Sequence, residues 1–265
     1  MPEKQYIAPW RRGMTSFLTF IVLVYAGVCI SLYVFQRSLI YFPQPEVSVR
    51  PAGTNLMILP ARGADIHVTV RPRDGRKALI YFGGNAENVV YSLPDLAASF
   101  PRHAIHLMHY RGYGGSEGKP SEAALFADAL MLFDEVHAKY EHVVVMGRSL
   151  GSGVATYLAS QRPVSRLVLV TPFDSIMAIA QQQFPWLPVR WLLQDKYESS
   201  AYAPKIAVPT LLITAEHDEI IPLSNTKTLL EFFRPGVAEL SIVAGTGHNT
   251  ISESPEYGRL LRSGQ

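Results

Sequence analysis

Apolar and polar positions divide the chain into two parts. From Thr15 to Phe35 the sequence runs for 21 residues without a charged side chain. As a helix this run would be about 31 Å long, close to the roughly 30 Å thickness of a membrane's hydrocarbon core. Arg11 and Arg12 precede the run and Arg37 follows it. The pattern predicts a transmembrane helix (span 15–35) within an N-terminal segment of residues 1–40, flanked by basic residues as such helices usually are.

Two other interpretations of this run are weaker. The apolar region of a cleaved signal peptide is usually about 7–15 residues long and precedes small residues, whereas this run is longer and ends in bulky side chains at 32–35. A buried core helix rarely needs so long an uncharged stretch. More basic residues lie before the run than after it, which predicts a cytoplasmic N-terminus and places residues 41–265 outside the cytoplasm. The residues compared are Lys4, Arg11 and Arg12 against Arg37 and Arg50.

Residues 41–265 alternate between two patterns. Short runs rich in β-branched residues predict strands, and longer stretches between them predict helices. Continuous apolar strands alternating with helices indicate an α/β fold, with a mostly parallel sheet covered by helices on both faces. The predicted strands are Ile66–Val70, Ala78–Phe82, Ile105–Tyr110, Val143–Met146, Leu167–Val170, Thr210–Thr214 and Leu240–Val243, and the predicted helices are Glu87–Ser99, Ser121–Tyr140, Leu150–Gln161 and Leu223–Phe233.

One long interval, Thr171–Lys205, breaks this alternation with four prolines and several large aromatic residues. It is too long for an ordinary connection between elements, so we predict a small helical cap over one end of the sheet at about residues 172–205. Two interpretations of its aromatic residues stay open. They either pack only within the cap or form an apolar wall of a substrate site.

Charge and cysteine content exclude several function classes. The formal net charge is +2, but residues 1–40 carry a net +3 and the remaining 225 residues a net −1. A slightly acidic domain without a basic run is a poor nucleic-acid binder. The single cysteine, Cys29, excludes a disulfide within the chain and a cysteine-based zinc site. His106 and His109 point to opposite faces of a predicted strand and do not converge on a metal, so we expect no metal and no cofactor.

The sequence places a candidate nucleophile between a strand and a helix. The apolar run Val143–Met146 is followed by Gly147-Arg148-Ser149-Leu150-Gly151 and then by a helical pattern. This is the G-x-S-x-G nucleophile elbow, in which a tight turn presents the serine hydroxyl above the sheet. Gly147 and Gly151 are required because a side chain at either position would collide with neighbouring backbone. Ser149 is therefore the predicted nucleophile.

A serine nucleophile needs a base, and the base needs an acid that orients it. With this elbow the chain order is serine, acid, histidine. Only two histidines follow Ser149, and His248 is the predicted base because it lies in a glycine-flanked loop after the last predicted strand. Asp218, shortly after the preceding strand, is the predicted acid, with Glu216 as the runner-up. We interpret Glu219 as a solvated charge and His217 as a structural residue.

The reaction also needs hydrogen-bond donors for an oxyanion. The backbone N–H of Leu150, directly after the nucleophile, is one predicted donor. The backbone N–H of Asn85 is the other, because Gly83 and Gly84 after the strand at 78–82 let the backbone approach a substrate closely. Asn85 is also a plausible helix N-cap, and the two roles are compatible.

Taken together, these motifs resemble the α/β-hydrolase superfamily, and most of all the membrane-anchored branch that includes Bem46 and alpha/beta hydrolase domain-containing protein 13. The resemblance covers roughly residues 30–260. The segments that carry it are Gln36–Pro43, Gly84–Ala86, Tyr110–Ser116, Gly147–Gly151, Thr171–Ser175, His217-Asp218 and Gly247-His248. One departure is Gly83, where this branch usually has histidine, and it bears on the geometry of the oxyanion loop.

The resemblance implies a serine hydrolase acting on esters or thioesters, with Ser149, Asp218 and His248 as its triad. The sequence therefore predicts a membrane-anchored hydrolase that forms an acyl-enzyme from a small-molecule or lipid-like acyl ester. Two alternatives stay open at this stage. One is a peptidase on the same fold, and the other is a non-catalytic scaffold tethered to the membrane by the N-terminal helix.

Overall fold

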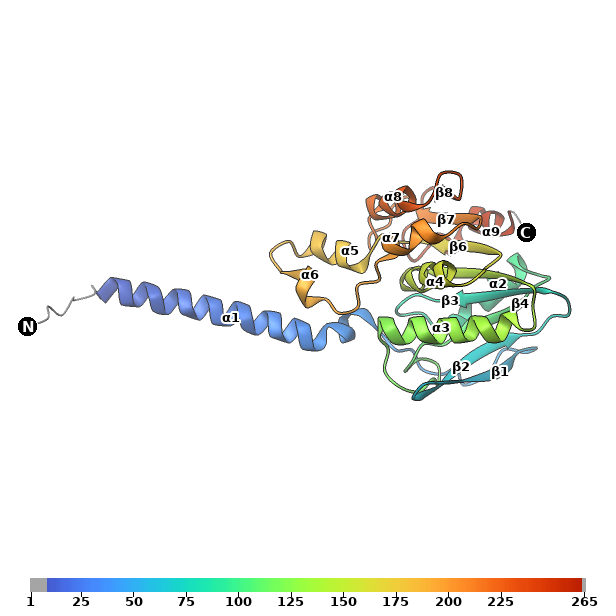
Figure 1. Ribbon diagram of the computed structural model, residues 1–265, viewed down its shortest axis with the longest axis horizontal. Helices are drawn as coiled ribbons and strands as arrows, with labels where there is room; N and C mark the ends of the chain where they lie inside the picture. The colour runs from blue at the N-terminus through green and yellow to red at the C-terminus, as the bar shows by residue number, and fades with distance from the viewer. Residues whose placement is uncertain (1–8, 264–265) are drawn as a thin grey trace, which may run out of the picture.

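The computed structural model describes residues 9–263, so that Lys4 and the rest of the tail 1–8 lie outside the described residues. A single helix, α1 (Pro9–Ile40), extends away from the remainder of the molecule (Figure 1). It contains the predicted helix and continues beyond it at both ends. The part from Gly13 to Ile40 is long and apolar enough to cross a membrane. Side chains from 13 to 28 are all exposed, which excludes a buried core helix.

An eight-stranded sheet organises the rest of the described chain, in the order β1-β2-β4-β3-β5-β6-β7-β8. Strand β2 is antiparallel to both of its neighbours, β1 and β4. The remaining strands, in the sheet order β4, β3, β5, β6, β7 and β8, run parallel to one another. This is the mostly parallel α/β sheet that the sequence predicts. The strands are β1 (Asn55–Ala61), β2 (Ala64–Arg71), β3 (Lys77–Phe82), β4 (Ala104–Met108), β5 (His142–Arg148), β6 (Arg166–Val170), β7 (Thr210–Ala215) and β8 (Ala238–Val243).

Helices cover both faces of the sheet, and each face has its own apolar core. One core joins the sheet to α3 (Glu122–His137), α4 (Leu150–Gln161) and α8 (Leu223–Phe232). The other joins it to α2 (Leu93–Ser99) and α9 (Pro255–Arg262). Because β3, β5 and β6 are buried on both faces, they read as continuous apolar runs rather than as alternating ones.

The predicted cap interval consists of short helices joined by loops. They are α5 (Ile176–Gln183), α6 (Val189–Leu192), α7 (Ser199–Tyr202) and the 3₁₀ turn η2 (Ala203–Lys205). In Figure 1, α5 and α6 lie on the side of the sheet domain from which α1 departs. The cap is thus the part of the domain that faces the apolar helix.

Three differences from the predicted elements have physical reasons. Strand β1 was not predicted, because it is a largely exposed edge strand that contains Pro60 and lacks a clear apolar period. Helix α9 was also not predicted, because it is only eight residues long and just two of its residues, Tyr257 and Leu261, are buried. The predicted helix Glu87–Ser99 is instead a 3₁₀ turn, η1 (Val89–Ser92), followed by α2, whose first turn holds Pro94. Glu87 precedes both η1 and α2, and its carboxylate accepts the backbone N–H of Gly84.

Candidate active site

Ser149 occupies a strained turn between β5 and α4. Its backbone has φ 50° and ψ −119°, in a region that residues other than glycine rarely adopt. Its N–H donates to the Val170 carbonyl at 2.9 Å, which fixes the turn to the neighbouring strand β6. A Cβ on Gly147 would collide with the Gly151 carbonyl, and one on Gly151 would collide with the Phe82 carbonyl. Close backbone packing on both sides is therefore what keeps the turn tight.

The side chains of Ser149, His248 and Asp218 form a continuous hydrogen-bonded chain. His248 Nε2 lies 3.1 Å from Ser149 Oγ, and His248 Nδ1 lies 2.9 Å from each Asp218 carboxylate oxygen. The Asp218 side chain is fully buried and that of His248 is 5% exposed, so water does not compete for these contacts. The geometry suits proton transfer from the serine hydroxyl to an imidazole whose other nitrogen is held by a carboxylate.

Each of these residues follows a strand of the parallel part of the sheet. Ser149 follows β5, Asp218 follows β7 and His248 follows β8, so all three lie at the carboxyl edge. Two further bonds hold the acid in place, because Asp218 Oδ1 accepts the N–H groups of Ile220 at 3.0 Å and Ile221 at 2.7 Å. The carboxylate is thus oriented from its own loop as well as by the histidine.

The competing residues near Asp218 have other partners. Glu216 is exposed and accepts the Gly245 N–H at 2.8 Å, so it does not reach the histidine ring. The His217 side chain is largely exposed. Glu219 is exposed, as expected of a solvated charge, but it also accepts the backbone N–H of His248 at 3.1 Å. This bond lowers the pKa of the Glu219 carboxyl, so the carboxylate stays charged while it holds the histidine loop.

The two predicted oxyanion donors, Leu150 and Asn85, lie in the first turn of α4 and in the loop after β3, which we call the oxyanion loop. Leu150 is the first residue of α4, so its N–H belongs to the first turn, where the helix itself supplies no acceptor. The loop after β3 borders the serine, since a Cβ on Gly84 would lie 3.7 Å from Ser149 Cβ. The Gly84 N–H is engaged by Glu87 at 2.8 Å, which leaves Asn85 as the predicted donor from this loop.

Two tyrosines hold this oxyanion loop from the segment after β4. Tyr110 donates its hydroxyl to the Gly83 carbonyl at 2.7 Å, and Tyr113 donates to the Asn85 carbonyl at 2.6 Å. Burial raises the pKa of both hydroxyls, so they remain protonated donors. A Cβ on Gly83 would lie only 2.6 Å from a Val89 methyl group. In this chain the loop is therefore braced by tyrosines, and no space is left for a histidine at position 83.

Sequence reasoning missed a partly buried ion pair behind the site. The Glu87 carboxylate accepts the Gly84 N–H at 2.8 Å and the Tyr81 hydroxyl at 2.7 Å. Its Oε2 lies 3.3 Å from Arg148 Nη1. The other end of the Arg148 guanidinium donates to the His248 carbonyl at 3.3 Å. One pair therefore connects the oxyanion loop, the nucleophile elbow and the histidine loop. The sequence contains only a weak signal for this pair, because Arg148 stands at a variable position of the elbow motif. Glu87 resembles an ordinary first-turn residue of the predicted helix.

Comparison with known proteins identifies the fold family. The family model described as alpha/beta hydrolase fold matches residues 77–196, which include the oxyanion loop and the elbow. The chain belongs to the α/β-hydrolase superfamily. The chain is also 34% identical over 257 residues to the uncharacterized protein Rv2307c of Mycobacterium tuberculosis, covering 86% of each sequence. The alpha/beta hydrolase domain-containing protein aho-3 of Caenorhabditis elegans is 34% identical over 158 residues, which cover 58% of this chain and 46% of that relative.

The solved structures whose fold is similar to that of this α/β hydrolase include esterases. The esterase of Pyrococcus furiosus superimposes with a TM-score of 0.62 at 17% identity, covering 84% of this chain and 98% of the esterase. Acetyl xylan esterase 1 of Thermoanaerobacterium superimposes with a TM-score of 0.60 at 19% identity, covering 82% and 87%. At these identities the likeness establishes the fold. The predicted superfamily and fold class are confirmed, and together with these neighbours they support a hydrolase activity.

Proposed function

We propose that this α/β hydrolase is a membrane-anchored serine hydrolase that cleaves carboxylic esters or thioesters through an acyl-enzyme. The observation that carries the proposal is the unbroken chain from Ser149 Oγ through the His248 ring to the buried Asp218 carboxylate. A serine is a weak nucleophile unless a base lies within hydrogen-bond reach, and here the base is both in reach and oriented. The esterase neighbours favour an ester over a peptide bond.

The reaction follows from the positions of these groups. His248 Nε2 takes the Ser149 proton as the oxygen attacks the acyl carbon, and the Leu150 and Asn85 N–H groups stabilise the oxyanion. The imidazolium then gives its proton to the leaving alcohol or thiol, and the carbon–oxygen or carbon–sulfur bond breaks. The same imidazole then takes a proton from water as the water oxygen attacks the acyl-enzyme. The imidazolium returns this proton to Ser149 Oγ as the bond between Oγ and the acyl carbon breaks, which releases the acid and restores Ser149. Asp218 holds the ring throughout and stabilises its positive charge.

Anchoring by α1 is supported by the exposure of its apolar side chains. A helix that is apolar around its whole circumference has no stable place in water unless something covers it. The end of α1 is also tied to the folded domain, because Arg37 lies 3.0 Å from the buried Asp195 carboxylate. A helix built into the domain in this way favours a retained anchor over a cleaved signal peptide. The excess of basic residues before the helix favours a cytoplasmic N-terminus.

Labelling with a fluorophosphonate probe tests the chemistry directly. We expect the full-length protein in detergent micelles to react with the probe and to hydrolyse p-nitrophenyl acetate. Ser149→Ala should lose both, whereas Ser160→Ala, a control on the same helix, should keep both. A folded wild-type protein that does not label, or a Ser149→Ala protein that labels equally, would overturn the mechanism.

A separate experiment tests the anchor. One portion of membranes that contain the full-length protein is washed with alkaline carbonate, which removes peripheral proteins. A separate portion of intact vesicles, not exposed to carbonate, is treated with protease. Retention in the membrane pellet supports a spanning helix. Release into the supernatant contradicts it. Digestion of the C-terminal domain from the non-cytoplasmic side alone supports the proposed orientation.

A further inference from the structure

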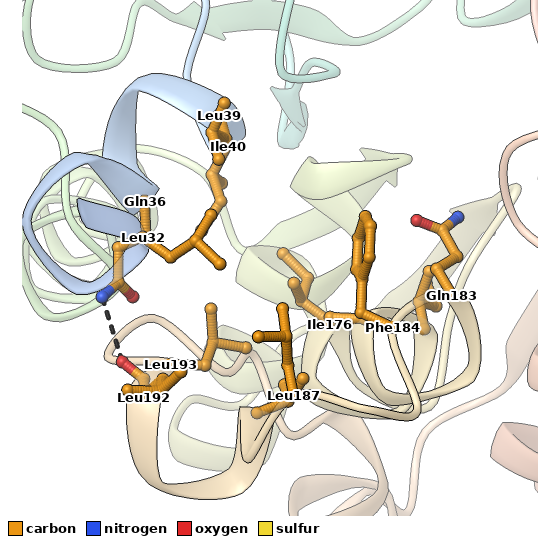
Figure 2. Close-up of a pocket in the computed structure, with 13 residues that line it drawn as sticks. Leu32, Gln36, Leu39, Ile40, Ile176, Gln183, Phe184, Leu187, Leu192 and Leu193 are labelled. Carbon is orange, nitrogen blue, oxygen red and sulfur yellow. Dashed lines mark hydrogen bonds between the residues drawn. The ribbon is translucent and has the colours of Figure 1, made fainter. Parts of the chain in front are cut away.

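An apolar groove lies between the last turns of α1 and the cap. Its walls are the α1 residues between Leu32 and Ile40, α5 with the following Phe184, and α6 with its flanks (Figure 2). Its volume is about 240 Å³. An apolar cavity of about 150 Å³ already suffices to bind a benzene-sized ligand. We call this space the anchor–cap groove.

The lining of the anchor–cap groove offers almost no polar group to a ligand. The polar residues among those that line it are Gln36 and Gln183. The Gln36 amide is used up elsewhere, because it donates to the Leu192 carbonyl at 3.0 Å and accepts the Gln194 N–H at 2.7 Å. The Gln183 amide extends away from the space between the helices (Figure 2). The surface presented to an occupant is therefore hydrocarbon.

Hydrogen bonds and an ion pair fix the two walls of the groove relative to each other. Besides the Gln36 bonds, Arg37 binds Asp195 through two nitrogens at 3.0 and 3.3 Å, and the Tyr41 hydroxyl donates to the same carboxylate at 3.0 Å. Apolar walls fixed at a distance lose the dispersion contacts that close packing would supply. An apolar guest restores those contacts, so the groove is preformed for one.

The inner end of the groove adjoins the active site. The Ile40 carbonyl accepts the Asn85 side-chain N–H at 3.1 Å, so the α1 wall ends on the oxyanion loop. The opposite wall starts at Ile176, six residues after Val170, whose carbonyl holds the Ser149 N–H. Both walls therefore begin at the sheet edge that carries the triad. The inner end of a chain lying in the groove would therefore be near this edge of the sheet.

The outer end of the groove faces the membrane if α1 spans it. The apolar part of α1 is 28 residues long, or about 42 Å, which exceeds the roughly 30 Å hydrocarbon core by about eight residues. With the N-terminal end of α1 at one interface, the groove residues 32–40 lie at the other interface. The exposed cap aromatic Trp191 suits that level, whereas Trp186 lies against α1 nearer its middle. The Trp186 carbonyl also accepts the Tyr25 hydroxyl at 2.9 Å, so the cap tip rests on the helix.

We propose that the anchor–cap groove binds the hydrocarbon chain of a long-chain acyl ester or thioester taken from the membrane, so that the anchor helix forms part of the substrate site. The inference rests on the proposed function, because the bound chain leads to Ser149. It adopts one of the two interpretations of the cap, that of an apolar substrate wall. A short acyl group reaches Ser149 without entering the groove, whereas a long one must enter it.

Chain-length selectivity of groove variants tests this proposal. Full-length protein in detergent micelles is assayed on the acetyl, octanoyl and dodecanoyl esters of p-nitrophenol. Ala180→Trp fills the groove from α5, and Leu39→Trp fills it from α1. Val34→Trp is a matched control, since Val34 and Leu39 are both 61% exposed on α1 but only Leu39 lines the groove.

We expect each groove variant to lower the dodecanoyl-to-acetyl ratio of kcat/KM by at least about tenfold, because a single methylene in an apolar pocket already changes kcat/KM by about that factor. The control should keep the wild-type ratio, and all three should label with the fluorophosphonate probe. Unchanged ratios in both groove variants would overturn the groove proposal, as would a wild type that hydrolyses only the acetyl ester. Acetyl ester turnover that survives in Ser149→Ala would instead overturn the proposed function.

A photo-crosslinking measurement does not depend on the folding of any variant. A fluorophosphonate whose long alkyl chain ends in a diazirine is first bound to Ser149 in the wild-type protein and then irradiated. We expect the crosslinked peptides to contain residues 32–40 or 176–193. Crosslinks confined to other parts of the chain would contradict the proposal even if the probe reacts fully with Ser149.

Discussion

The triad edge of the sheet and the junction between α1 and the cap are built in different ways. At the triad edge, each reacting side chain follows a strand of one parallel sheet and is held by several bonds, as Asp218 is by the histidine and by two backbone N–H groups. At the junction, a few side chains between 36 and 41 meet a few groups between 192 and 197. The candidate triad thus lies at the edge of the packed sheet, and the apolar helix is attached to the domain by a narrow set of contacts.

Under the proposed function, the two regions have separate tasks. Positioning within a few tenths of an ångström matters for proton transfer, and packed strands supply it. A groove for a flexible hydrocarbon chain needs only an apolar surface and an approximate width. Changes at the triad edge should therefore abolish turnover of every substrate. Changes at the junction should alter stability and chain-length preference while leaving the hydrolysis of a short ester largely intact.

The largest expected effect comes from the acid. Asp218→Asn keeps the shape of the side chain but removes the charge that selects and stabilises the productive form of His248, so we expect kcat on p-nitrophenyl acetate to fall by about 10⁴-fold. Glu216→Gln, two residues away, should leave kcat within about twofold, since Glu216 does not contact the ring. Steady-state kinetics with an unfolding measurement on each variant check this. Equal losses in both variants would contradict the assignment of Asp218.

The second effect concerns the ion pair that connects the three loops. Arg148→Met removes the bonds to Glu87 and to the His248 carbonyl, and a displacement of about 1 Å at the site costs about 10²-fold in rate. We expect kcat to fall by that order with KM little changed, and Arg148→Lys to recover part of the loss. Arg162→Met is the control, because Arg162 pairs with Asp134 near the surface.

A double-mutant cycle of Arg148 and Glu87 tests whether the two residues position the active site together or only stabilise the fold. If Arg148 and Glu87 act as one unit, the double variant Glu87→Gln with Arg148→Met should lose little more activity than either single variant. Independent, multiplying losses would show that the two residues act separately. A drop in unfolding temperature that accounts for the whole activity loss would also contradict a positioning role.

The local motifs explain why so much of this edge could be predicted from the sequence. The elbow needs its glycines within five residues, and chain order then leaves few candidates for acid and base, so the structure brings together the predicted Ser149, Asp218 and His248. The sheet was predictable because strands buried on both faces are continuously apolar. Strand β1 lacks that signal since it lies at an exposed edge.

Long-range contacts explain what the sequence did not reveal. The bonds from Glu87 to Arg148 join residues 61 positions apart, and those from Arg37 to Asp195 join residues 158 apart. Neither a hydrophobic periodicity nor a short sequence motif indicates contacts between residues so far apart in the chain. The anchor–cap groove is likewise invisible in the sequence, because its walls come from the first helix and from the cap. The transmembrane location and its orientation rest on composition and remain predictions.

Acid stability also distinguishes the sheet from the junction, because buried histidines lie in and beside β4. Burial lowers the pKa of His106 and of His109 to about 4, from an ordinary value of about 6.5. Below pH 6.5 the unfolded rings take up protons while the folded ones do not, so stability is lost progressively from about pH 6.5 down to about pH 4. Each ring accounts for up to about 3 kcal/mol at the acidic end.

Unfolding measured between pH 7 and pH 4 checks this expectation. His106→Gln should flatten the fall in unfolding free energy over that range, because the replacement does not titrate. His217→Gln removes a largely exposed ring and should leave the pH dependence as it is in the wild type. A pH profile that is the same in all three proteins would show that the buried rings do not control acid stability.

The smallest expected effect, and the one that most directly separates the two regions, is at the junction. Asp195 is 3% exposed and accepts bonds from Arg37 and Tyr41. Asp195→Asn keeps the volume but weakens both bonds, and because the Arg37 side chain is about half exposed we expect a loss of only about 1–2 kcal/mol in unfolding free energy. For a chain of this size that lowers the unfolding midpoint by about 2–8 °C. Acetyl ester turnover should stay within about twofold, whereas the dodecanoyl-to-acetyl ratio should fall as the groove loses its fixed width. A fall in acetyl turnover equal to the fall in dodecanoyl turnover would mean that the junction and the triad edge are coupled, and the division of tasks between them would then be wrong.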